Sequence, residues 1–289
     1  MTAAGDVGVR HEQVRAAGVN LHVARAGEGP PVILLHGFPE NWTTWRHQIG
    51  PLADAGFSVL APDLRGYNLS DRPAGREPYH LRHLVDDIAA LVRHTGQPRA
   101  HIVGHDWGGV IAWTFAGEYP ELLDKLVILN APHMQRFLEK VRRPPQMLRS
   151  AYAGFFQLPL LPERALAAHD FMLLRRIFTH TPARKDTYSA THIDEYVASM
   201  SRPGALTASL NYYRANTGSG FALARKVRTR AETLVIWGER DPALGTELLE
   251  RLDEFAPRVR IHRIRDVAHW VQNEAVLEVN RALLNFLAE

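Results

Sequence analysis

The stretch GHDWGGVIAWTFAGEYP, residues 104–120, decides the fold that we expect for this chain. Its first five residues read Gly-x-Asp-x-Gly and lie between a buried apolar strand at 100–106 and a helical pattern at 109–120. This arrangement is typical of a sharp strand-to-helix turn that lifts one nucleophile above a sheet. Such turns usually carry a serine, whereas Asp106 stands at the central position here. An aspartate before a helix is also a common N-cap, so the rest of the chain has to decide its role.

Strand and helix patterns alternate along most of the chain. Before residue 133, strands are expected within 13–27 (two around a turn) and at 31–37, 58–63, 100–106 and 125–132, with helices at 44–56, 81–96 and 109–120. After residue 231, the patterns predict a strand at 232–238, a helix at 246–257, a strand at 258–266 and a helix at 273–289. This alternation predicts an α/β fold, with a mostly parallel central sheet and helices on both faces.

The alternation stops between residues 133 and 227. This segment has helical patterns and several prolines but no clear strand pattern. We therefore expect one α/β core, made of residues 1–132 and 228–289, that is interrupted by an inserted helical cap at residues 133–227.

The composition narrows the classes of function. The first twenty residues contain no apolar run with basic flanks, and the longest apolar stretches are far shorter than a membrane span. The chain has no cysteine, which excludes disulfides and thiolate metal sites. Its basic residues are scattered along the sequence, so the pI of 9.3 is weak support for nucleic-acid binding. We expect a cytoplasmic protein with no membrane or nucleic-acid partner, no metal and no cofactor, and a homodimer stays possible.

Three further segments fall at strand ends, where open parallel sheets place their sites. HGFPENWTTW (36–45) follows a strand, and its backbone N–H groups and that of Trp107 are candidates for an oxyanion hole. WGERDPA (237–243) places Asp241 on a loop, and VAHW (267–270) places His269 after the last strand. Each segment alone is an ordinary turn. Together, Asp106, Asp241 and His269 follow the chain order of nucleophile, acid and base.

A carboxylate nucleophile suits a particular class of substrate. It is ionised at neutral pH and needs no base before it attacks. Attack on an ester or amide would give a reactive anhydride, whereas attack on an electrophilic sp³ carbon gives an ordinary ester. That ester must then be cleaved by water with the help of a base, which is the role expected for His269 held by Asp241. The residues therefore point to alkylating substrates such as epoxides and haloalkanes.

These motifs together resemble the α/β-hydrolase superfamily and, within it, the epoxide hydrolases. HGFPE, DLRGYNLSDRP (63–73), GHDWGG, GERDP and AHW match the family pattern, and the resemblance runs from about residue 11 to the end of the chain. It implies the α/β-hydrolase fold with Asp106 as nucleophile, Asp241 as acid and His269 as base. It also implies an oxyanion hole from the backbone of Phe38 and Trp107.

The resemblance extends to the expected cap. YAGFFQLP (152–159) and NYYR (211–214) match segments that carry two tyrosines in the family, Tyr152 and Tyr213, which donate to the epoxide oxygen. The motif does not decide between Tyr213 and its neighbour Tyr212, and tyrosines in helices are commonly core aromatics. The expected substrate is a small apolar epoxide together with water. The residues expected to bind it are Phe38, Trp107, Phe156 and Trp270.

Two alternatives stay open. A haloalkane dehalogenase shares the fold, the aspartate and the following tryptophan, but a halide leaves without a proton, so the paired tyrosines favour an epoxide. Some dehalogenases place their acid at the position of Asn130, and the asparagine there leaves the acid role with Asp241. A non-catalytic small-molecule receptor on the same scaffold would have no need for Asp106, Asp241 and His269 together.

Overall fold

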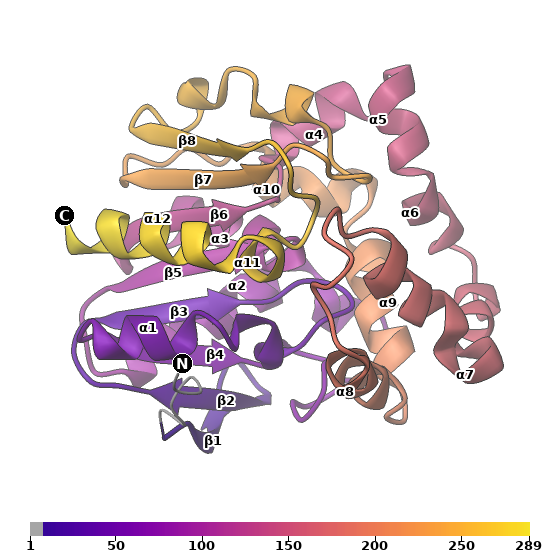
Figure 1. The fold of residues 1–289 in the computed structure, drawn as a ribbon, viewed down its shortest axis with the longest axis horizontal. Coiled ribbons are helices and arrows are strands. Elements are labelled where there is room, and N and C mark those ends of the chain that lie inside the picture. Colours follow the sequence, from indigo (N-terminus) through magenta and orange to yellow (C-terminus); the bar gives the residue numbers. More distant parts are fainter. Residues whose placement is uncertain (1–7) are drawn as a thin grey trace.

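The computed structural model describes residues 8–289, and an eight-stranded sheet forms its centre (Figure 1). The strands lie in the order β1-β2-β4-β3-β5-β6-β7-β8. β2 pairs antiparallel with β1 and with β4, and the pairs from β4 to β8 are parallel. The strand bounds are β1 Arg10–Arg15, β2 Asn20–Ala26, β3 Pro31–Leu35, β4 Ser58–Pro62, β5 Ala100–His105, β6 Leu123–Leu129, β7 Thr233–Gly238 and β8 Val259–Ile264.

Helices cover both faces of this sheet and the edge where its parallel strands end (Figure 1). Their bounds are α1 Ile49–Asp54, α2 Leu81–His94, α3 Trp107–Glu118, α4 Met134–Lys140, α5 Pro144–Arg149, α6 Ala151–Phe155, α7 Leu161–His180, α8 Ala190–Met200, α9 Ala205–Ala215, α10 Ala222–Arg225, α11 Val271–Glu274 and α12 Val276–Ala288. Short 3₁₀ turns complete the described chain: η1 Trp42–Trp45, η2 Glu77–Tyr79, η3 Gly218–Phe221, η4 Thr246–Leu249 and η5 Leu252–Glu254.

Successive residues of the central strands supply two hydrophobic cores. In β3, Ile33 and Leu35 belong to the core under α2 and α3, whereas Val32 and Leu34 belong to the core under α1 and α12. This alternation follows from the two-residue period of a strand, and it explains why β3 is a continuous apolar run. The central strands of the sheet are therefore buried on both faces, and their carboxyl ends are free to carry a site.

The segment between β6 and β7 is helical in the structure. It contains α4 to α10, which lie beyond the carboxyl ends of the strands, with α4 and α8 at opposite ends of the group (Figure 1). Within α7 the helical dihedrals are interrupted at residues 168–171, three of which have positive φ. We call residues 133–227 the cap segment below; its division from the core stays a prediction.

The α/β architecture predicted from the sequence is confirmed, but two of the predicted helices are not continuous. Residues 246–257 do not form a helix but the two 3₁₀ turns η4 and η5. Glu250 between them is extended, and Arg251 has a φ of 55°, so the helical hydrogen bonds cannot continue through this point. The predicted helix at 44–56 is likewise divided into η1 and α1. Within residues 8–289, no helix has the length and apolar character needed to cross a membrane.

Candidate active site

The turn between β5 and α3 holds Asp106 in an unusual backbone conformation. Its φ is 49° and its ψ is −121°, outside the regions that non-glycine residues normally occupy. The turn also packs tightly, because a Cβ atom on Gly108 would lie 2.2 Å from the carbonyl oxygen of Leu35. Only glycine fits there, which explains the small residues around the aspartate. The sharp turn projects the Asp106 carboxylate from the carboxyl edge of the sheet.

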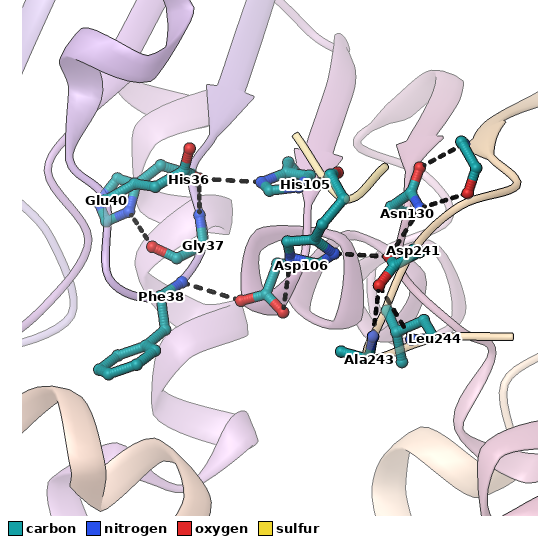
Figure 2. A network of polar contacts seen from close by, with 12 residues as sticks. His36, Gly37, Phe38, Glu40, His105, Asp106, Asn130, Asp241, Ala243 and Leu244 are labelled. Carbon is teal, nitrogen blue, oxygen red and sulfur yellow. Dashed lines mark hydrogen bonds and ion pairs between the residues drawn. The ribbon is translucent and has the colours of Figure 1, made fainter. Parts of the chain in front are cut away.

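The two carboxylate oxygens of Asp106 have different surroundings (Figure 2). The backbone N–H of Phe38 donates a hydrogen bond of 2.8 Å to Oδ1. Oδ2 lies 3.7 Å from Nε2 of His269. The backbone before Phe38 can come this close to Asp106 only because residue 37 is glycine. A Cβ atom on Gly37 would lie 2.4 Å from the Cβ atom of Asp106. One oxygen is thus fixed by the backbone, and the other faces an imidazole.

His269 is held by a buried carboxylate. Its Nδ1–H donates a hydrogen bond of 2.7 Å to Oδ2 of Asp241, which also accepts one of 2.7 Å from the side-chain amide of Asn130. The backbone N–H groups of Ala243 and Leu244 donate to the other oxygen of Asp241, at 2.8 and 3.0 Å. Burial opposes ionisation of Asp241, but His269 and these donors outweigh it and lower its pKa. Asp241 therefore stays ionised and fixes the imidazole orientation.

The electrostatics of His269 depend on both aspartates. Burial disfavours the charged imidazole, but the carboxylates of Asp241 and Asp106 outweigh it and raise the pKa of His269 to about 9. With both aspartates ionised, His269 is thus a cation at neutral pH. Removal of either negative charge would lower this pKa.

A mostly apolar cavity of about 340 Å³ lies directly above Asp106. Its size is at the lower end of the range for small-molecule sites. Its lining comes from α3, from the cap segment and from the loop after β7, and includes Asp106, Trp107, Val110, Met134, Phe137, Leu138, Val141, Tyr152, Tyr213, Phe221 and Leu244.

Of the predicted tyrosines, Tyr152 and Tyr213 both line this cavity. Their rings lie nearly perpendicular, with centroids 6.1 Å apart. Burial of the hydroxyls, together with the negative charge of Asp106, raises the pKa of both phenols, so both stay protonated at neutral pH. Tyr212 points elsewhere, because its hydroxyl donates a hydrogen bond of 2.7 Å to the carbonyl oxygen of Arg65. The two neighbours on α9 thus have different surroundings.

The aromatic residues expected to bind substrate divide into two groups. Trp107 lines the cavity, and as the first residue of α3 it has a backbone N–H among the unpaired donors of that helix. Phe38, Phe156 and Trp270 are buried but are not among the lining residues. The ring centroids of Phe38 and Phe156 lie 5.7 and 5.0 Å from that of Tyr213. The ring centroid of Trp270 lies 5.1 Å from that of His269.

Three polar residues around the site were not assigned from the sequence. Asn130 bridges two strands, since it donates to Asp241 and its side-chain oxygen accepts from the N–H of Gly238 at 2.8 Å. His105 directly precedes Asp106. Its ring nitrogen Nδ1 lies 2.9 Å from Oε2 of Glu40, and its Nε2 lies 3.0 Å from the carbonyl oxygen of His269. The side chains of His105 and Glu40 are fully buried (Figure 2). Glu40 lies in the motif HGFPE and His105 in the motif GHDWGG, so these motifs could have pointed to both residues.

Comparisons with known proteins agree with this geometry. A family described as the alpha/beta hydrolase fold matches residues 30–276. AB hydrolase superfamily protein YfhM of Bacillus subtilis is 39% identical over 284 residues, which cover 97% of this chain and 98% of that protein. Epoxide hydrolase 4 of Mus musculus is 37% identical over 285 residues, which cover 96% of this chain and 79% of that protein.

Solved structures give the same result. The epoxide hydrolase of Bacillus megaterium in complex with an inhibitor has a TM-score of 0.86 at 32% identity, with 96% of this chain and 100% of that chain covered. Epoxide Hydrolase A from Mycobacterium thermoresistibile also has a TM-score of 0.86 at 32% identity, with 97% and 98% covered. The chain therefore belongs to the alpha/beta hydrolase fold family and, within it, to the epoxide hydrolases.

Proposed function

We propose that this enzyme converts an epoxide to a vicinal diol through a covalent ester on Asp106. The observation that carries the proposal is the unequal environment of the two Asp106 oxygens at the floor of an apolar cavity. Oδ1 is held by the Phe38 N–H, while Oδ2 faces His269. The names of the relatives and of the solved structures support the same activity.

In the first step, Oδ2 of Asp106 attacks one carbon of the epoxide ring. A carbon–oxygen bond forms to the carboxylate as the ring carbon–oxygen bond breaks, and the ring oxygen takes a proton from Tyr152 or Tyr213. Alkoxides are far more basic than phenolates, so a phenol is an effective donor here. Oδ1 becomes the carbonyl oxygen of the resulting ester and keeps its hydrogen bond from Phe38.

In the second step, water cleaves the ester. Esterification removes the negative charge of Asp106, which is one of the charges that raise the pKa of His269. The imidazole then releases its proton, which restores the phenol, and Nε2 is free to take a proton from water. The hydroxide attacks the ester carbonyl, and the Phe38 and Trp107 N–H groups stabilise the negative oxygen. When this intermediate collapses, the bond from the acyl carbon to the diol oxygen breaks, and that oxygen takes up the proton of the added hydroxyl group. The diol is released and Asp106 returns as a carboxylate.

We expect terminal epoxides to be the preferred substrates. Residues of α4 and α6 form part of the cavity lining. The ring of Trp270 packs against that of His269 on one side and against that of Phe178 on the other, and Phe178 stacks on Tyr196 of α8. All three aromatic side chains are buried. One substituent therefore has room beside Asp106, whereas a second substituent on the other ring carbon would meet this aromatic packing.

A substrate panel tests the proposal. The purified enzyme is incubated with styrene oxide, cyclohexene oxide and a long-chain terminal epoxide, and with chlorinated and brominated alkanes. We expect diol from the terminal epoxides, slower reaction of cyclohexene oxide and no halide release. Halide release without diol formation would instead identify a haloalkane dehalogenase, and tight epoxide binding without turnover would identify a receptor.

A further inference from the structure

Exposed apolar side chains are concentrated on one part of the cap segment. Among residues 8–289, eleven large hydrophobic side chains are exposed, and eight of them lie between Met147 and Leu173. The most exposed of these are Leu148 at 72%, Leu160 at 63% and Leu161 at 52%. The eight residues are Met147, Leu148, Tyr152, Leu158, Leu160, Leu161, Met172 and Leu173. A concentration of this kind on a soluble surface usually marks an interaction site.

The same region has an excess of positive charge. Residues 136–176 contain eight basic and three acidic side chains, a net charge of +5, whereas the whole chain has a net charge of +3. Several of these side chains form ion pairs, such as Lys140 with Glu250. Among the described residues, no carboxylate lies within 4.0 Å of Arg142, Arg143, Arg164 or Arg176, and all four are exposed. The exposed leucines are thus accompanied by cations that pair with no carboxylate in the described part of the chain.

The helices that carry most of these residues lie along one edge of the molecule, and one of the residues reaches the cavity. α5, α6 and α7 follow one another along the outer edge of the cap segment, on the side away from the sheet (Figure 1). Tyr152 on α6 belongs to both features, since it is 38% exposed and also lines the cavity above Asp106. The apolar, basic surface therefore reaches the cavity that holds the nucleophile.

We propose that this surface, which we call the cap face, docks on an anionic phospholipid membrane. The cap face consists of the eight apolar residues above with Arg142, Arg143, Arg164 and Arg176. Leucine and methionine side chains enter the boundary between headgroups and acyl chains, and the arginines bind lipid phosphates, which is the usual chemistry of a protein that lies on a membrane without crossing it. A second copy of the chain is a poorer partner, because a twofold contact would bring the cations of both cap faces into one interface.

Docking would give the site direct access to substrate dissolved in lipid, a consequence that rests on the proposed function. Apolar epoxides partition into membranes, and the cavity is apolar and reaches the cap face at Tyr152. The docking itself is independent of catalysis and is measured without any epoxide.

Sedimentation of the full-length protein with sucrose-loaded vesicles tests the docking. Vesicles of phosphatidylcholine with 30% phosphatidylglycerol are compared with vesicles of phosphatidylcholine alone, at about 0.1 M salt. One variant changes Arg142, Arg143, Arg164 and Arg176 to Gln, and a second changes Leu148 and Leu160 to Ser. We expect the wild type to bind the anionic vesicles. The arginine variant should bind them at least about tenfold more weakly, since each arginine near the surface contributes roughly a fivefold change. The leucine variant should also bind at least about tenfold more weakly, because less apolar surface enters the membrane.

Matched controls separate the cap face from general attraction of a basic protein. The charge control changes Arg99, Arg230, Arg265 and Arg281 to Gln, which removes the same charge from exposed core positions. The apolar control changes Leu277, which is 82% exposed on α12, to Ser. Both controls should bind like the wild type, and all variants should keep the wild-type circular dichroism and the wild-type rate on a water-soluble epoxide.

Three outcomes would overturn the proposal. The first is no binding of the wild type to anionic vesicles, and the second is equal loss of binding in the charge control and in the cap-face arginine variant. The third is a dimer in analytical ultracentrifugation that dissociates when Leu148 and Leu160 become Ser, which would make the face a protein interface. A protein that binds vesicles through the cap face but forms no diol would refute the proposed function and leave the docking intact.

Discussion

The two sides of the active site are held in place by different forces. On the core side, Asp241 accepts hydrogen bonds from His269, Asn130 and two backbone N–H groups, and Asp106 accepts one from the backbone of Phe38. On the cap side, Tyr152 and Tyr213 are positioned largely by the packing of aromatic rings. The charged groups are thus fixed to the sheet by directional hydrogen bonds, whereas the positions of the two phenols depend on how the cap segment packs.

The largest effect is expected on the core side. Changing His269 to Gln should lower steady-state turnover by about 10⁴-fold or more, because the ester can form but is no longer hydrolysed. The protein should gain the mass of one epoxide, which mass spectrometry would locate on the peptide with Asp106. His262, on β8 outside the site, is the matched control, and its change to Gln should leave turnover unchanged. An inactive His269 variant without the adduct would show that alkylation also needs this histidine.

A smaller effect is expected on the cap side. Changing Tyr152 or Tyr213 to Phe should slow alkylation but leave measurable turnover, since the other phenol still donates a proton. The double change should slow alkylation by about 10²–10⁴-fold in single-turnover measurements, which is the usual contribution of a general acid. Phenylalanine retains the ring packing, so a cavity is not the cause.

Tyr212 gives the control for this experiment. Its hydroxyl bonds to the backbone of Arg65 and not to the cavity, so Tyr212→Phe should affect stability more than alkylation. If the doubly substituted enzyme opens epoxides at the wild-type rate, Tyr152 and Tyr213 are only packing residues and the cap side has no chemical role.

The smallest expected effect is a lower pKa of His269 when Asp106 loses its charge. Asp106→Asn replaces the carboxylate with a neutral amide, as the ester does in the proposed cycle. The pKa of His269, about 9 with both aspartates ionised, should then fall, because one of the charges that favour the imidazolium is gone. Titration of the His269 ring by NMR, assigned through the His269→Gln variant, measures it. An unchanged pKa would mean that Asp106 does not control when His269 becomes a base.

The core side was largely predictable from the sequence. Its reactive residues follow buried strands, and the parallel sheet brings these strand ends to one edge. Asn130 could not be assigned in the same way, because its contact with Asp241 depends on the pairing of β6 with β7 and no local motif records that register. The helix predicted at 246–257 is absent for a reason that the local pattern also does not record. Its leucines are buried in two separate turns, one on each side of Arg251.

The cap side was less predictable for a physical reason. Tyr212 and Tyr213 are neighbours on α9, so a rotation of about 100° decides which of them faces the cavity, and the sequence motif does not contain that rotation. Phe156 and Trp270 were expected at the substrate, whereas the structure packs them behind the cavity lining. A cytoplasmic location and a homodimer stay predictions.

The oxygen source in a single turnover tests the covalent mechanism most directly. Enzyme in excess over epoxide is allowed to react once in ¹⁸O-labelled water, and both the diol and the peptide with Asp106 are analysed by mass spectrometry. If Asp106 is the nucleophile, the oxygen added to the first diol comes from its carboxylate. The account therefore predicts an unlabelled diol and ¹⁸O in Asp106. A fully labelled diol with unlabelled Asp106 would mean that water attacks the epoxide directly, and would contradict the account.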